Sequence, residues 1–240
     1  MIGVSAQQLA GLSSRLRSTQ PRRRGRMWAL SLERRVGLVC AALRTNLTLR
    51  ELAALFAISK SQVHRVVADL TPQLAALMMP PRINRHTWIV DGTLIPTRDH
   101  AVAGKSKNYR WSCNAQILVR ALDLHVLAVS AGGSGNRNDV VHYRGSRIEA
   151  LCRAHGHVLA DGGYRGVPEL RTPAFRGGRV VRDGRWRRHR RRRARVEHAI
   201  ARLKDWRVLR DHRRRGGHVE TTIQAVAFLH NLRLEMRDRS

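Results

Sequence analysis

The sequence predicts an α/β protein with a helical first part, a strand-rich middle and a helical end. Apolar residues recur at helical spacing from about residue 31 to residue 70. Short runs of isoleucine, valine and leucine, bounded by glycine or charged turns, follow between residues 86 and 161 and are typical of strands. Helical spacing returns from about residue 193. At 240 residues, of which 42% are hydrophobic, the chain can bury a core and is too apolar for global disorder.

Pro80-Pro81 marks the expected boundary between two domains. We expect a basic arm at residues 1–30, a helical domain at 31–80 and a larger domain at 81–240. The arm includes the arginine-rich segment 21–26, which is typical of a flexible, solvated tail. Ser31 is the expected N-cap of a helix to about Arg44, with one apolar face formed by Leu32, Val36, Val39, Cys40 and Leu43.

Two capping boxes predict a helix-turn-helix. Thr48-Leu-Arg-Glu51 opens a helix to about Phe56, and Ser59-Lys-Ser-Gln62 opens a second helix to about Leu70, where Pro72 interrupts it. The shared core is expected to contain Leu52, Leu55, Ile58, Val63, Val66 and Val67. The second helix would present polar side chains to the major groove of DNA, namely Lys60, Ser61, Gln62, His64 and Arg65. An ordinary helical hairpin is the alternative, because capping boxes are common.

The middle of the chain predicts four strands, at about His86–Asp91, Ala115–Leu122, Leu124–Ser130 and Val158–Asp161. A glycine-rich loop at residues 132–138 and one helix from about Val140 to Ala154 separate the third strand from the fourth. No glycine-rich nucleotide-binding motif occurs, so we expect no nucleotide cofactor.

The charge balance predicts a polyanionic partner. The chain has 46 Lys and Arg against 17 Asp and Glu, a formal net charge of +29, and neutralising phosphates releases their counterions. Residues 176–195 contain eleven arginines and one acid, Asp183. Trp186 interrupts this run and a helical pattern from about Arg193 to Trp206 follows it, which favours an ordered, DNA-facing surface over a solvated tail. A last helix is expected from about Glu220 to Met236.

Three isolated acids stand out in this basic chain. Asp91 and Asp161 each end an apolar run, before Gly-Thr and Gly-Gly-Tyr, while Glu197 shares a helix face with Arg193 and Lys204. Taken singly, each acid is explained by a turn or an ion pair. Together they indicate a site where two Mg²⁺ ions, roughly 3.5–4 Å apart, act on a phosphodiester. Mg²⁺ prefers oxygen ligands and needs few protein carboxylates.

At these residues the chain resembles the DDE transposases of bacterial insertion sequences, in the branch related to the eukaryotic Harbinger-type nucleases. Asp91 matches the first acid, in Val-Asp-Gly-Thr, and Asp161 matches the second, in Asp-Gly-Gly-Tyr. Glu197 matches the third, with thirty-five residues between it and Asp161, and Arg193 and Lys204 match the arginine and lysine of the Y-(2)-R-(3)-E-(6)-K motif. The chain departs from this motif at its tyrosine position, which holds Arg190. The resemblance covers about residues 30 to 235.

The resemblance implies an RNase H-like mixed-sheet core flanked by helices, with the helix-turn-helix at residues 48–70 before it. It implies that Asp91, Asp161 and Glu197 are catalytic and hold two Mg²⁺ or Mn²⁺ ions for strand cleavage and strand transfer. Arg190, Arg193 and Lys204 would bind DNA phosphates, and Trp186 is a candidate to replace the missing tyrosine. Asp139, in Asn136-Arg-Asn-Asp139, also resembles a recurrent acid of the group and is a fourth, lesser candidate.

Double-stranded DNA, at element ends and at the target, is therefore the expected partner, bound by a homo-oligomer. A non-catalytic DNA-binding regulator or decayed transposase is the alternative, and composition alone also fits a ribosomal or RNA-packaging protein. Three widely spaced cysteines suit a reducing cytosol, and no apolar stretch approaches the ~20 residues that span a bilayer. We expect a cytoplasmic protein without membrane contact.

Overall fold

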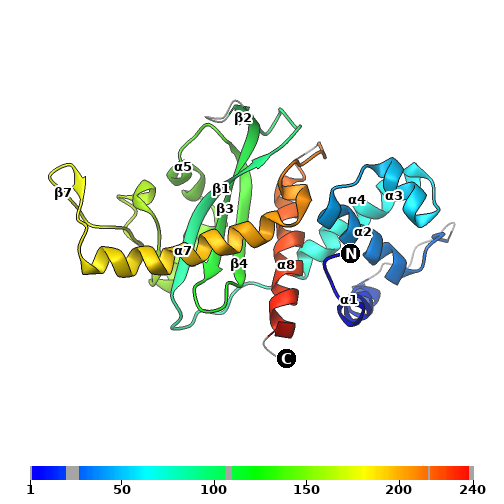
Figure 1. The fold of residues 1–240 in the computed structure, drawn as a ribbon, viewed down its shortest axis with the longest axis horizontal. Coiled ribbons are helices and arrows are strands. Elements are labelled where there is room, and N and C mark those ends of the chain that lie inside the picture. The colour runs from blue at the N-terminus through cyan, green and yellow to red at the C-terminus, as the bar shows by residue number, and fades with distance from the viewer. Residues whose placement is uncertain (1, 20–26, 106–109, 216, 238–240) are drawn as a thin grey trace.

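The computed structural model describes residues 2–19, 27–105, 110–215 and 217–237. Figure 1 shows a central sheet with helices packed beside it, and a group of N-terminal helices at one end. The fold is a mixed α/β arrangement with an RNase H-like core and a helical N-terminal part, as the sequence predicts. None of the helices in the described ranges is both long enough and apolar enough to cross a bilayer.

The helix-turn-helix forms as predicted, with one extension. Both capping boxes are made at the starts of α3 (Leu49–Phe56) and α4 (Lys60–Ala76). The prediction that Pro72 ends the second helix is wrong, because α4 continues through it to Ala76. Leu70, Leu74 and Ala75 are buried where α4 packs against α8 (Val219–Arg237), and this burial offsets the backbone hydrogen bond that proline cannot donate. Leu55, expected in the shared core, is instead exposed.

The N-terminal segment is not a solvated tail over the part that the structure describes. Residues Ala6–Thr19 form α1, which buries Leu12 and Leu16 against α2 (Leu32–Thr45). The Gln8 side-chain amide donates to the Leu232 carbonyl of α8. The arginine-rich segment 21–26 lies outside the described residues. Helix α2 begins after its predicted N-cap, Ser31, and its predicted apolar face packs into the core.

The main sheet has six strands in the order β2-β3-β1-β5-β6, with β4 pairing on β3. The long strands, β1, β3 and β4, are antiparallel neighbours, and the short β5 and β6 run parallel to β1. Their bounds are Trp88–Pro96, Gly104–Lys105, Trp111–Arg120, Val126–Ser134, Val158–Leu159 and Leu170–Arg171 for β1 to β6. Apolar side chains of β1 alternate between a core facing α7 and α8, which includes Ile89, and a smaller core around Trp88 and Val90.

Three predicted boundaries in this region are wrong. Strand β1 does not end at Asp91 but continues for five residues, because every residue of Trp88–Pro96 pairs with β3. Strand β4 extends into the predicted glycine-rich loop as far as Ser134. The single helix expected at about 140–154 is two helices, α5 (Asp139–Tyr143) and α6 (Arg147–His155). They are separated at Gly145, whose φ of +73° suits glycine and interrupts helical geometry.

The basic run is largely helical. Helix α7 (Gly184–Lys204) begins nine residues before the predicted start at 193, with Asp183 as its N-cap. A short hairpin, β7 (Phe175–Arg176) and β8 (Arg179–Val180), precedes it. In Figure 1 this hairpin and the first turns of α7 extend away from the sheet, while the second half of α7 crosses it. The last helix, α8, matches its prediction.

Candidate active site

Asp91 lies inside β1 with its side chain only 15% exposed. Burial raises the pKa of its carboxyl to about 6, although the nearby Arg193 guanidinium lowers it. The negative charges of Asp161 and Asp139 raise the pKa of Asp91 further, so both carboxylates are close enough to act on it. The strand therefore carries a buried acid whose raised pKa comes first from burial and then from two neighbouring carboxylates.

Arg193 connects Asp91 with Glu197. Its Nη1 donates to Asp91 Oδ2 over 3.0 Å, and its Nη2 donates to Glu197 Oε1, one helical turn further along α7. The sequence suggested that Arg193 and Lys204 flank Glu197 as two phosphate-binding cations. Arg193 is instead paired with two acids, and the side chain of Glu197 is 54% exposed. One guanidinium thus joins the strand acid to the helix acid.

Asp161 follows β5 and forms a turn. Its Oδ1 accepts the Gly163 backbone N–H over 2.8 Å and caps the short 3₁₀ helix η1 (Gly162–Tyr164). Because β5 runs parallel to β1, with Trp88 opposite Val158, Asp161 leaves the sheet on the side where β1 carries Asp91.

A buried polar network lies beside these acids. The Tyr164 hydroxyl donates to Gln116 Oε1, which ties the Asp161 turn to the middle of β3. Gln116 Nε2 donates to Asn114 Oδ1 over 2.9 Å and to Asp139 Oδ1 over 3.2 Å, and Asn114 Nδ2 donates to Asp139 Oδ1 over 2.7 Å. Burial and the three neighbouring carboxylates raise the pKa of Tyr164 well above its usual range. Gln116 and Asn114 gave no signal in the sequence, because isolated amides in a strand match no motif.

Asp139 lies against Gly92, where an added Cβ would sit 2.0 Å from its Oδ1. Successive residues of a strand point to opposite faces, so Asp139 approaches the face of β1 opposite to that of the Asp91 side chain. Only glycine permits this approach, which gives a physical reason for Gly92 in the Val-Asp-Gly-Thr block. Asp139 therefore lies next to the β1 backbone beside Asp91, on the other face of the sheet. Its Oδ1 accepts hydrogen bonds from the side-chain amides of Asn114 and Gln116.

The remaining predicted residues lie in two other places. Lys204 ends α7, and burial lowers the pKa of its ammonium group. Arg190 is exposed, and its guanidinium lies 5.4 Å from the ring of Trp186, one turn earlier. In the helix-turn-helix, Lys60, Ser61, His64 and Arg65 are exposed on α4, while the Gln62 side chain accepts from the Ser59 N–H in the capping box.

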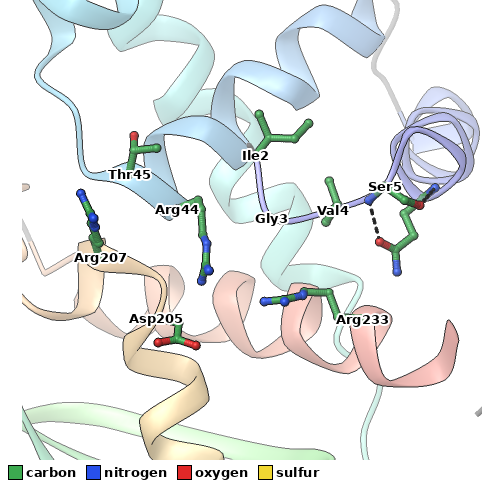
Figure 2. Close-up of a pocket in the computed structure, with 10 residues that line it drawn as sticks. Ile2, Gly3, Val4, Ser5, Arg44, Thr45, Asp205, Arg207 and Arg233 are labelled. Atoms are coloured by element: carbon green, nitrogen blue, oxygen red, sulfur yellow. Dashed lines mark hydrogen bonds between the residues drawn. The ribbon is translucent and has the colours of Figure 1, made fainter. Parts of the chain in front are cut away.

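A cavity of about 690 Å³ lies away from these acids, where the N-terminal segment meets α2, α8 and the end of α7. Figure 2 shows Arg44, Arg207 and Arg233 around it, with Asp205 as the acid drawn there. None of Asp91, Asp161 and Glu197 lines this cavity, so it is distinct from the cluster of acids.

Residues 85–232 match the family model described as "Transposase DDE domain". The chain belongs to the DDE transposase family. Residues 28–80 match a second model, "Helix-turn-helix of DDE superfamily endonuclease". The chain is also 42% identical over 239 residues to the "Putative transposase for insertion sequence element IS112" of Streptomyces albus G, covering 97% of this chain and 93% of that protein.

Membership of this family bears on whether the three acids could hold metal ions. DDE transposases generally use divalent metal ions, and the matched DDE region contains Asp91, Asp161 and Glu197. Within the described ranges, no three Asp, Glu, His or Cys side chains are grouped closely enough to hold an ion as they stand. The donors nevertheless suit Mg²⁺ or Mn²⁺, because they are all carboxylates. The pKa of Asp91 is raised chiefly by burial and further by the charges of Asp161 and Asp139, so a bound cation would favour its ionised form.

Proposed function

We propose that this DDE transposase cuts DNA at the ends of its element and joins the freed ends to target DNA. The observation that carries the proposal is the pair of hydrogen bonds that Arg193 donates, one to Asp91 on β1 and one to Glu197 on α7. In support of the proposal, Asp91 and Glu197 thus share one guanidinium and Asp161 acts on Asp91 through its negative charge, in a chain of net charge +29.

Asp91, Asp161 and Glu197 are the catalytic residues in this proposal, and they would hold two Mg²⁺ or Mn²⁺ ions. Bound ions would neutralise charge on the phosphate and on the attacking and leaving oxygens. Arg193 would move from the acids to the DNA phosphate when the ions and DNA bind, since its two present partners are the proposed metal ligands. Lys204 and Arg190 would bind other phosphates of the same DNA strand.

The reaction has two phosphoryl-transfer steps. In the first, a water oxygen bonds to phosphorus at the element end, the bond to the 3′ oxygen breaks, and a 3′-OH and a 5′-phosphate result. In the second, that 3′ oxygen bonds to a target phosphorus and displaces the target's own 3′ oxygen. Each step exchanges one phosphorus–oxygen bond for another, so no redox cofactor or nucleotide is required.

The helix-turn-helix would supply sequence recognition. Exposed Lys60, Ser61, His64 and Arg65 lie along one helix, α4, as a recognition helix requires for the major groove. Gln62 is a lesser candidate, because its side chain already serves the capping box. Cutting two element ends would require more than one copy, so we propose a homo-oligomer on DNA, acting where the bacterial chromosome lies, in the cytoplasm.

The test is cleavage of a DNA fragment that contains the inverted repeats flanking the gene. Purified protein with Mg²⁺ is expected to nick at the repeat ends and join them to a target plasmid, and Asp91→Asn is expected to bind equally but not cut. Binding without cutting by the wild type would favour the non-catalytic DNA-binding alternative. Preference for ribosomal RNA over duplex DNA would favour the RNA-binding alternative.

A further inference from the structure

The cavity of about 690 Å³ in Figure 2 has walls from three parts of the chain. Residues 2–5 form one wall, and the last turn of α2 forms the second. Helix α8 and the chain that follows α7 form the third. A volume of about 300–1,000 Å³ is typical of small-ligand sites, so this cavity has room for a molecule larger than one phosphate ion.

The lining of this cavity is positively charged. It contains Arg44 on α2, Arg207 after α7 and Arg233 on α8, and the acid in the described lining is Asp205. Asp205 Oδ1 lies 3.5 Å from Nη2 of Arg210, a residue that does not line the cavity. Asp205 therefore has a cation of its own outside the cavity, and the lining keeps an excess of positive charge.

Arg44 carries a donor that the described residues do not satisfy. Its Nη1 is buried and has no hydrogen-bond acceptor within the described ranges. The guanidinium lies 5.7 Å from the ring centre of Trp206, which is fully buried. Gly3 packs on both residues, since a Cβ there would lie 3.0 Å from Trp206 Cη2 and 3.2 Å from Arg44 Cδ. A buried guanidinium without an acceptor loses a hydrogen bond that it makes in water, and an anion in the cavity would restore it.

Arg44 and Arg233 face the same space from different helices. Figure 2 shows the Arg44 side chain of α2 and the Arg233 side chain of α8 pointing toward one another, between residues 2–5 and Asp205. Guanidinium groups bind phosphate oxygens through paired, charge-assisted hydrogen bonds, and two of them on separate elements can hold one phosphate group between them. Such a ligand would join α2 of the helical domain to α8 of the catalytic domain.

We propose that this cavity binds a phosphate group between Arg44 and Arg233, which fixes the helical domain against the catalytic domain. The proposal goes beyond the proposed function, because Asp91, Asp161 and Glu197 do not line the cavity. Two sources carry this chemistry, a free phosphate compound and the DNA backbone, and the experiment below separates them. In either case a free phosphate compound should stabilise the folded protein when no DNA is present.

The test is thermal unfolding of the full-length, DNA-free protein without divalent metal ions, in potassium pyrophosphate and in potassium chloride of equal ionic strength. Millimolar pyrophosphate is expected to raise the Tm by about 3 °C or more over chloride. Arg44→Gln with Arg233→Gln should lose most of this rise. The matched control is Arg34→Gln with Arg50→Gln, the same charge change at exposed residues outside the cavity, of which Arg34 shares α2 with Arg44.

Calorimetric titration with pyrophosphate keeps the test independent of folding defects in the double variant. Arg207→Gln replaces an exposed residue of the lining and should weaken pyrophosphate binding severalfold. No pyrophosphate-specific rise of Tm in the wild type, or a rise that the cavity pair retains, would overturn the proposal. A rise that the cavity and control pairs lose equally would also overturn it, in favour of general attraction of anions to a basic chain.

Binding of a labelled DNA duplex identifies the source of the phosphate group. If the group belongs to a free compound, the cavity pair should bind the duplex as well as the control pair does, and pyrophosphate should still bind the protein–DNA complex. If the group belongs to the DNA backbone, duplex and pyrophosphate should compete, and the cavity pair should lose more duplex affinity than the control pair.

Discussion

Arg193 Nη1 lies 3.0 Å from Asp91 Oδ2, which links helix α7 to strand β1 at the candidate active site. The same guanidinium pairs with Glu197, so two of the proposed metal ligands share one internal cation. A cation held between carboxylates competes with any ion that those carboxylates bind.

The first prediction concerns this competition. Arg193→Gln is expected to increase the affinity of the DNA-free protein for Mn²⁺ severalfold, measured by calorimetric titration, because Asp91 and Glu197 lose their counter-charge. DNA cleavage should nevertheless fall, since a phosphate contact is lost. Arg191→Gln, an exposed neighbour on α7, should leave Mn²⁺ affinity unchanged. Weaker Mn²⁺ binding by Arg193→Gln would contradict this account.

The second prediction concerns stability and pH. Because the pKa of Asp91 is raised from 3.8 to about 6, the folded protein holds a proton that the unfolded chain has released between these pH values. Ionising Asp91 therefore lowers the free energy of unfolding as pH rises through this window, and the full cost remains above it. The side chain in Asp91→Asn does not ionise, so the free energy of unfolding of this variant lacks this pH-dependent cost.

Urea denaturation of Asp91→Asn and wild type across this range measures the effect. The stability of Asp91→Asn relative to wild type should rise by about 1–3 kcal/mol from about pH 4 to about pH 7. A constant or falling difference would show that the Asp91 carboxyl is not strained in the folded protein.

The third prediction concerns the Tyr164 hydroxyl, which donates to Gln116 beside the acids. Tyr164→Phe leaves a buried amide oxygen without its donor and should lower the free energy of unfolding by about 1–3 kcal/mol. Cleavage should fall as well, because this bond fixes the turn that carries Asp161. Tyr143→Phe is the control, since its hydroxyl donates to Glu169 instead. If both variants lose cleavage equally, Tyr164 has only a structural role.

The fourth prediction concerns the helix-turn-helix. The affinity for duplex DNA should fall steeply with salt, and Lys60→Ala and Arg65→Ala should each reduce the slope of log affinity against log salt concentration by about one. Arg153→Ala is the control, because Arg153 pairs with Glu149 on α6. Unchanged slopes in the two α4 variants would show that this helix does not contact phosphates.

The sequence predicts this fold where local chemistry decides the structure. Both capping boxes and the Ser31 N-cap are hydrogen-bonded as the residue types require. The predictions that are wrong concern segments whose structure depends on long-range packing. Pro72 stays inside α4 because α8 covers that helix, and Asp91-Gly92 stays extended because β3 pairs along its whole length. Neither partner can be read from neighbouring residues.

The site is only partly readable for the same reason. Three acids match a motif by spacing, but the pairing of Arg193 with Asp91 joins residues 102 positions apart. The Tyr164–Gln116 bond and the approach of Asp139 to Gly92 likewise depend on the finished sheet. Sequence spacing therefore predicts the proposed metal ligands, whereas the residues that contact them are found only in the folded structure.

The most direct measurement of the central claim is the initial rate of Mg²⁺-dependent cleavage at the inverted-repeat ends by Asp91→Asn, Glu197→Gln and the double variant. If the acids act as one site, each single variant should lose on the order of a thousandfold or more, and the double variant should lose no more than either. Asp205→Asn, just beyond α7, should retain the wild-type rate. Cleavage within about tenfold of wild type by either single variant, or losses that multiply in the double variant, would contradict a shared site.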